Sequence, residues 1–121
     1  MNKRELNSAY ITLANASLES VAVKDRIEII RLLRHVRPEA EAYGNFVSEI
    51  REKNMDIIGS PDPAMAKRVA ELNKAVDEEG DKEVNIESNM LSAETFGKLL
   101  ESNPKWNVAQ MMLIEDIFVK K

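Results

Sequence analysis

A heptad stripe of apolar residues that runs straight through a proline constrains this chain more than any other feature. Its members are spaced alternately by four and three positions, which keeps them on one face of a helix; they are Ile29, Leu33, Val36, Ala40, Tyr43, Val47 and Ile50. Pro38 lies between Val36 and Ala40, opposite the stripe, so the carbonyl group that loses its partner, that of Arg34, faces water. The pattern predicts one long, proline-kinked helix over about residues 24–54, with its apolar face turned to a core.

Length and composition favour one domain over residues 1–121. A chain of 121 residues can bury roughly two thirds of the surface that it exposes when unfolded. Aromatic residues make up only 5% of the chain, so aliphatic and methionine side chains must fill the core. The chain has no cysteine, which excludes disulfides and thiolate metal sites. It has neither a transmembrane-length apolar run nor an apolar signal region, so we expect a cytoplasmic protein and no membrane partner.

The charge pattern does not favour nucleic-acid binding. The net charge is −4, whereas sequence-independent binding to nucleic acid needs a concentrated positive surface. Basic residues do gather between Lys24 and Arg37, but they alternate with Asp25, Glu28 and Glu39. Such alternation is typical of a solvated helix face. We therefore expect no nucleic-acid partner.

The first helix is predicted from its start signal. Asn2 can cap it, and Glu5 stands three residues later, which is the layout of a capping box. A turn is expected near residues 18–23, before the long helix. Within the long helix, Ala40 and Gly44 are small and four residues apart, which would let another helix approach closely. The alternative is that Gly44 marks a second bend or the end of the helix.

A second amphipathic helix is predicted after the loop at residues 59–63. Asp62 is a good N-cap and Pro63 suits the first helical position. Met65, Val69, Leu72 and Val76 again step by four and three residues, and the helix is expected to end near Val76, with Gly80 supplying the stop. Two such helices joined by a short loop predict an antiparallel helical hairpin.

The last third of the chain reads as a small α+β region. The segment 83–87 alternates polar and apolar residues, as a half-buried strand does. Helices are predicted after Ser92 and after Asn107, and residues 117–119 could form a second strand that pairs with residues 84–86. The predicted fold class is thus mainly α, with a helical part over residues 1–79 and a small α+β part over residues 80–121.

Catalytic and metal-binding signals are weak. His35, the only histidine, lies on the charged side of the stripe, and no nucleophile elbow or phosphate-binding glycine loop is present. Acidic residues alternate from Asp77 to Glu83, but Gly80 stands at the fourth position of that count and Ser88 at the twelfth, where a calcium loop needs other residues. A solvated acidic turn is the better interpretation. We predict no catalytic residue, no cofactor and no metal site.

Four apolar residues near the C-terminus are the candidate partner-binding residues. They are Trp106, Met111, Met112 and Phe118. Tryptophan in or beside a loop can anchor a partner, and methionine recurs at adaptable binding surfaces. Taken alone, each of the four residue types more often belongs to a core than to an interface, and aromatic residues are scarce in this chain. We expect that a partner surface, if the protein has one, includes at least one of them.

The order of these features resembles a group of small, uncharacterised helical proteins encoded by phages and prophages. The resemblance spans about residues 20–100 and lies in the proline-containing helix segment from Leu32 to Tyr43, the Val84-Asn85-Ile86 segment and the Leu91-Ser92-Ala93-Glu94 segment. It implies a phage-encoded accessory or assembly protein that acts through contacts, and it carries no catalytic residues to transfer.

These observations lead to two functional hypotheses. The first is a non-enzymatic phage or prophage accessory or virion-assembly protein, which binds a phage structural protein or a host protein. The second is a small regulatory protein that binds a host or phage factor and can dimerise through the heptad face. Both predict protein–protein contacts, allow a homo-oligomer, and place the protein in the host cytoplasm or in the virion.

Overall fold

The computed structural model describes all residues 1–121 and contains six helices and no β-sheet. The helices are α1 (Lys3–Ala14), α2 (Val23–Lys53), α3 (Met55–Ile58), α4 (Pro63–Asp81), α5 (Ala93–Ser102) and α6 (Val108–Phe118). The predicted, mainly helical architecture is confirmed. None of the six helices combines the length and the apolar character needed to span a membrane.

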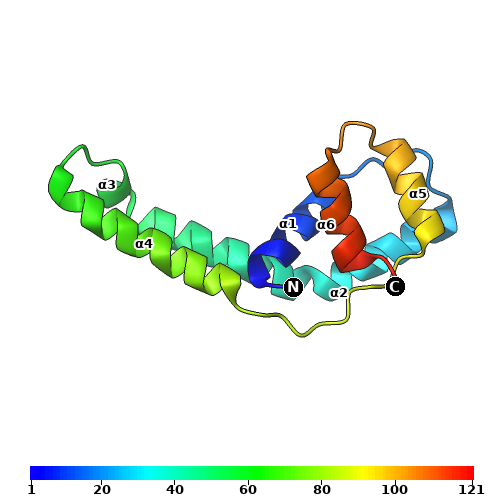
Figure 1. Ribbon diagram of the computed structural model, residues 1–121, viewed down its shortest axis with the longest axis horizontal. Coiled ribbons are helices and arrows are strands. Elements are labelled where there is room, and N and C mark those ends of the chain that lie inside the picture. Colours follow the sequence, from blue (N-terminus) through cyan, green and yellow to red (C-terminus); the bar gives the residue numbers. More distant parts are fainter.

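The long helix α2 continues without a break through Pro38, as predicted. The proline is exposed, while Val36 and Ala40 on the opposite side are fully buried. Figure 1 shows one continuous helix that changes direction in its middle. Because the lost hydrogen bond lies on the solvent side, the helix keeps a single apolar face on both sides of the proline.

Helix α1 crosses α2 at the small residues Ala40 and Gly44. Its start has the predicted capping box, since the Asn2 side chain accepts from the backbone N–H of Glu5 and the Glu5 side chain accepts from that of Asn2. The Asn7 side chain donates a hydrogen bond of 2.8 Å to the carbonyl of Ala40, and a Cβ atom on Gly44 would lie 3.1 Å from Asn7. The close approach predicted from these two residues is confirmed, and Gly44 does not end the helix.

The core lies between α1, the first half of α2, α5 and α6. Its fully buried side chains include Leu6, Ile29, Leu99, Ile114 and Phe118. Between Tyr43 and Gly80, by contrast, no residue is buried. We call residues 44–79 the arm; it contains the second half of α2, α3 and most of α4, and it projects away from the other helices (Figure 1).

The stripe is expected to face a core along its whole length, which predicts that Val47 is buried. This is wrong, because Val47 lies in the arm and is half exposed. The arm consists of only two layers of helix, with α4 lying beside the second half of α2 (Figure 1). No third element covers the stripe at that level. The same heptad pattern therefore has two environments, a buried one up to Tyr43 and a half-exposed one beyond it.

The predicted pair of strands is not formed. The extended segment after α4 makes one antiparallel bridge, between Asn2 and Glu83, and so pairs with the N-terminus. Residues 117 and 118 complete α6, because Ile114, Ile117 and Phe118 recur at helical spacing on its buried side. The bridge that follows α6 joins Val119 to Leu91 and not to residues 84–86.

Gly80 does not stop α4, which continues to Asp81. Its φ angle is not positive, so no left-handed conformation is needed there. A Cβ atom at this position would lie 2.7 Å from Nη2 of Arg4 and 2.9 Å from the hydroxyl of Tyr43. The glycine thus serves close packing of α4 against α1 and α2, and the helix extends past the predicted end at Val76.

The substitution Val36→Asp tests the core. We expect it to cost at least about 4 kcal/mol of unfolding free energy, because it places an unpaired charge at a fully buried position. Circular dichroism and thermal melting measure the loss. The control is His35→Asp, which places the same group on an exposed neighbouring position. A Val36→Asp protein with an unchanged melting temperature would refute the core assignment.

The substitution Pro38→Ala tests the solvent-facing proline. Alanine restores one backbone hydrogen bond and favours the helix by up to about 3 kcal/mol relative to proline. We expect the fold to be kept and the melting temperature to stay the same or rise. A clear drop in melting temperature would show that the bend itself is needed for packing.

Candidate functional site

The four predicted partner-binding residues do not form one surface. Phe118 is 0% exposed and belongs to the core, so it is not available as an exposed anchor. Trp106 is half buried and packs against the core. Met111 is also half buried, whereas Met112 on α6 is 57% exposed. Of the four, Met112 offers the largest exposed fraction to a partner.

Trp106 borders a hollow of about 380 Å³ whose polar groups already serve the fold. The Asn103 side chain accepts from the N–H of Ser17 at 2.8 Å and donates to its carbonyl at 2.9 Å. The Ser102 hydroxyl accepts from the N–H of Ser20 at 2.8 Å. These bonds tie the end of α5 to the turn after α1. The polar groups of the hollow therefore hold these two segments together, and Trp106 lies at its edge.

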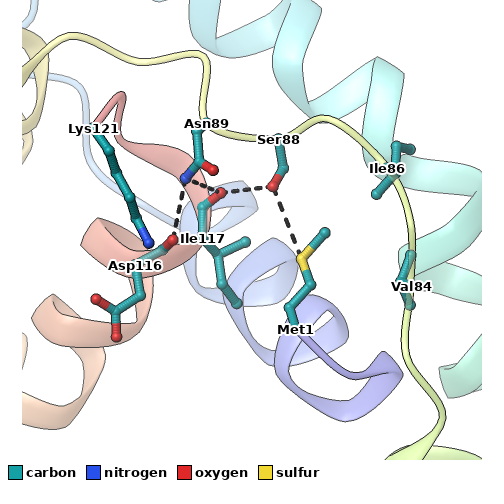
Figure 2. Close-up of a pocket in the computed structure, with 8 residues that line it drawn as sticks. All are labelled: Met1, Val84, Ile86, Ser88, Asn89, Asp116, Ile117 and Lys121. Atoms are coloured by element: carbon teal, nitrogen blue, oxygen red, sulfur yellow. Dashed lines mark hydrogen bonds between the residues drawn. The ribbon is translucent and has the colours of Figure 1, made fainter.

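A second hollow, of about 220 Å³, lies where the chain passes the end of α6 (Figure 2). The Asn89 side chain donates to the carbonyls of Asp116, Ile117 and Val119 at 3.0–3.1 Å. The Ser88 hydroxyl donates to the carbonyl of Ile117 at 2.7 Å. The last carbonyls of a helix lack hydrogen-bond donors inside the helix, and the side chains of Ser88 and Asn89 donate to them. The polar groups of this hollow therefore cap the C-terminus of α6.

The sequence suggested a solvated acidic turn at the end of α4. The structure differs, because basic side chains bind the acidic residues of this segment. Arg4 binds Asp81 at 2.9 Å and donates to the backbone carbonyl of Asp77 at 3.1 Å. Glu79 lies between Lys3 and Lys82, and both lysines form ion pairs with it. These pairs link the start of α1 to the end of α4 at the base of the arm. They also offset the unfavourable placement of acidic groups at a helix C-terminus.

The ion pairs shift two pKa values. The hydrogen bond from Lys3, and then that from Lys82, lowers the pKa of Glu79 below its ordinary value of 4.5. The hydrogen bond to Asp81 raises the pKa of Arg4. The carboxylate of Glu79 is therefore stabilised in its charged form by the bases around it, which joins the arm to α1 electrostatically.

The arm carries nine large apolar side chains that are only partly covered. Its apolar side chains, which we call the seam, are Phe46, Val47, Ile50, Ile57, Ile58, Met65, Val69, Leu72 and Val76. None of them is buried, and Ile58 is 44% exposed. A soluble protein seldom leaves so many apolar residues of one surface partly exposed, and such surfaces mark contact sites.

A groove of about 360 Å³ opens along the seam between α2, α3 and α4. Five apolar side chains line it, together with Arg51 and Asn73; they are Ile50, Ile58, Val69, Leu72 and Val76. Arg51 is exposed and forms no ion pair within the chain. The groove can accept an apolar helix face, and Arg51 can pair with a carboxylate that such a helix brings.

The sequence predicted the residues of the seam but not their exposure. The spacing of Val69, Leu72 and Val76 predicts packing within a helix pair, and it marks no residue of the groove as a binding residue. One signal was present, because the chain offers no third amphipathic element next to the loop at residues 59–63 that could cover this pair. The exposure of the seam thus follows from the absence of a third helix over this pair.

No family model, no curated protein and no solved structure matches this chain. Its function is therefore inferred from its own residues and their arrangement.

Acidification of a Glu79→Gln variant tests the ion pairs at the base of the arm. A lowered pKa means that the Glu79 carboxylate adds stability above pH 4.5 and that this contribution is lost as the pH falls through the folded-state pKa. We expect Glu79→Gln to be less stable than the wild type at pH 7, and the difference to shrink below pH 4.5. Denaturant unfolding at several pH values measures it.

The control for this experiment is Glu71→Gln, an exposed carboxylate of the same helix that forms no ion pair. It should leave the pH dependence unchanged. A stability difference between Glu79→Gln and the wild type that is equal at all pH values would contradict the role given to the charge.

Proposed function

We propose that this protein is a non-enzymatic accessory or assembly protein that acts through protein–protein contacts, and that the seam of its arm is the main contact surface. The observation that carries the proposal is the absence of any buried residue between Tyr43 and Gly80. An arm that lacks a core of its own has little role in stabilising the other helices, and it presents apolar surface at a distance from them.

The paired helices of the arm suit this role. We propose that α4 and the second half of α2 act as the antiparallel helical hairpin that their heptad spacing predicts. The ion pairs from Lys3 and Arg4 to the end of α4 hold its base. A rigid base and a free seam together let the hairpin enter a groove, or receive a helix, on another protein.

The proposed setting is a phage or prophage, in the assembly of the virion. This part rests on the resemblance of residues 20–100 to small helical proteins of phages and prophages. The partner would be a phage structural protein or a host protein, and the site of action the host cytoplasm or the virion. Assembly proteins of this kind need contact surfaces and no chemistry, which suits a chain whose only histidine is exposed.

A regulatory protein that binds a host or phage factor as a dimer is the second candidate. One observation bears on its dimer: the first half of the heptad face, with Ile29, Val36 and Ala40, is fully buried inside the chain. A dimer through the heptad face would therefore use only the half that lies in the arm. The two candidates share this surface and differ in what binds there.

Capture of partners from the native host tests the proposal. We expect Leu72→Glu, which places a charge in the seam, to reduce the amount of captured partner at least about tenfold. Circular dichroism of this variant should show that the helices are retained. Lys67→Glu is the control, because it introduces the same group on α4 opposite the seam. Met112→Glu tests the alternative surface on α6.

Mass spectrometry of the captured material identifies the partner. Loss of the partner with Met112→Glu but not with Leu72→Glu would move the contact surface to α6. Capture at full strength by all three folded variants would refute the proposal.

A further inference from the structure

We infer that the arm is a dimerisation element, and that two copies of this chain pack their seams together around a twofold axis as a four-helix bundle. The inference rests on the proposed function, because it takes the seam as the contact surface and names its occupant. Its evidence is the exposed area of the chain, the small side chains beside the seam and the charge balance along it.

The exposed area matches what a dimer would cover. A compact protein of 13.7 kDa exposes about 6,600 Å². This chain exposes 7891 Å², an excess of about 1,300 Å². Each partner of a standard protein interface buries about 800 Å². The excess is therefore large enough for one stable interface. The arm, which has no buried residue, is the part that projects from the compact body (Figure 1).

The arm has the geometry of half a bundle. Two antiparallel helices bury apolar residues only along the line where they touch, whereas four helices enclose them in a core. The residues that follow Met65 and Val69 are Ala66 and Ala70, both exposed, and Asn73 follows Leu72 on the same flank and lines the groove. Small uncharged side chains on this flank allow another helix to approach to the distance of packed helices.

The charge of the arm permits two identical copies to meet. Between Phe46 and Val76, the stretch that holds the seam, the chain has five acidic and five basic residues. The arm ends in three further acidic residues, of which Asp77 and Glu79 pair with Arg4 and Lys3 at its base. Two copies that approach through their seams therefore face no net repulsion along that stretch.

A second copy satisfies these three observations without a further assumption. Homodimers with a twofold axis are the commonest oligomers, and the same patch on both copies then forms the interface. A different protein would have to bring an apolar surface of equal area and a neutral charge balance. Such a partner is the competing outcome of the experiment.

Analytical ultracentrifugation of the full chain tests the inference. We expect a species of twice 13.7 kDa across the micromolar range. Ala70→Glu places a bulky charge on a residue that is exposed in the single chain, so the fold is kept while close approach is blocked. We expect this variant, and Leu72→Glu, to weaken association at least about hundredfold, and Lys67→Glu to leave it unchanged.

Three outcomes separate the two proposals. A dimer that Ala70→Glu dissociates, with unchanged circular dichroism of the monomer, supports the inference. A wild-type protein that stays monomeric while Leu72→Glu loses a captured partner of another sequence overturns the inference and leaves the contact surface in place. A dimer that only Lys67→Glu or Met112→Glu dissociates also overturns it, because the interface would then lie elsewhere.

Discussion

The packing of α1 across the middle of α2 is the interaction on which the rest of the structure depends. Leu6, Ala9 and Leu13 are almost completely buried in this contact, which forms where Ala40 and Gly44 make room for it. The same short helix also contacts α6 on one side and, through Lys3 and Arg4, the end of α4 on the other. Where α1 covers α2, the core is closed. Beyond Gly44, α1 no longer covers α2, and the arm begins.

Local features of the fold could be predicted from the sequence because their causes are local. The capping box of Asn2 and Glu5 and the start of α4 at Asp62 and Pro63 depend on residues a few positions apart. The continuity of α2 through Pro38 follows from the phase of its own apolar stripe. In each case the bonds that decide the outcome lie within one or two turns of helix, so the sequence alone contains them.

Contacts between distant segments were harder to predict. Gly80 was assigned as a helix stop because glycine often is one, but its neighbours in space are Arg4 and Tyr43, far away in the chain. The alternation at residues 83–87 correctly indicated an extended segment, yet its pairing partner is the N-terminus and not the end of α6. The sequence left the place of Phe118 open for the same reason, since nothing near it in sequence shows that α1 and α6 pack together.

The two halves of the heptad stripe show what such a pattern does and does not determine. Val36 and Val47 both belong to the stripe, but Val36 is fully buried and Val47 half exposed. Each needs an apolar neighbour on the same side of the helix, because apolar area left in water costs about 25 cal/mol per Å². For Val36 that neighbour comes from within the chain. Val47 and most of the seam are covered only in part within the chain, and the partner surface that we propose would cover the rest.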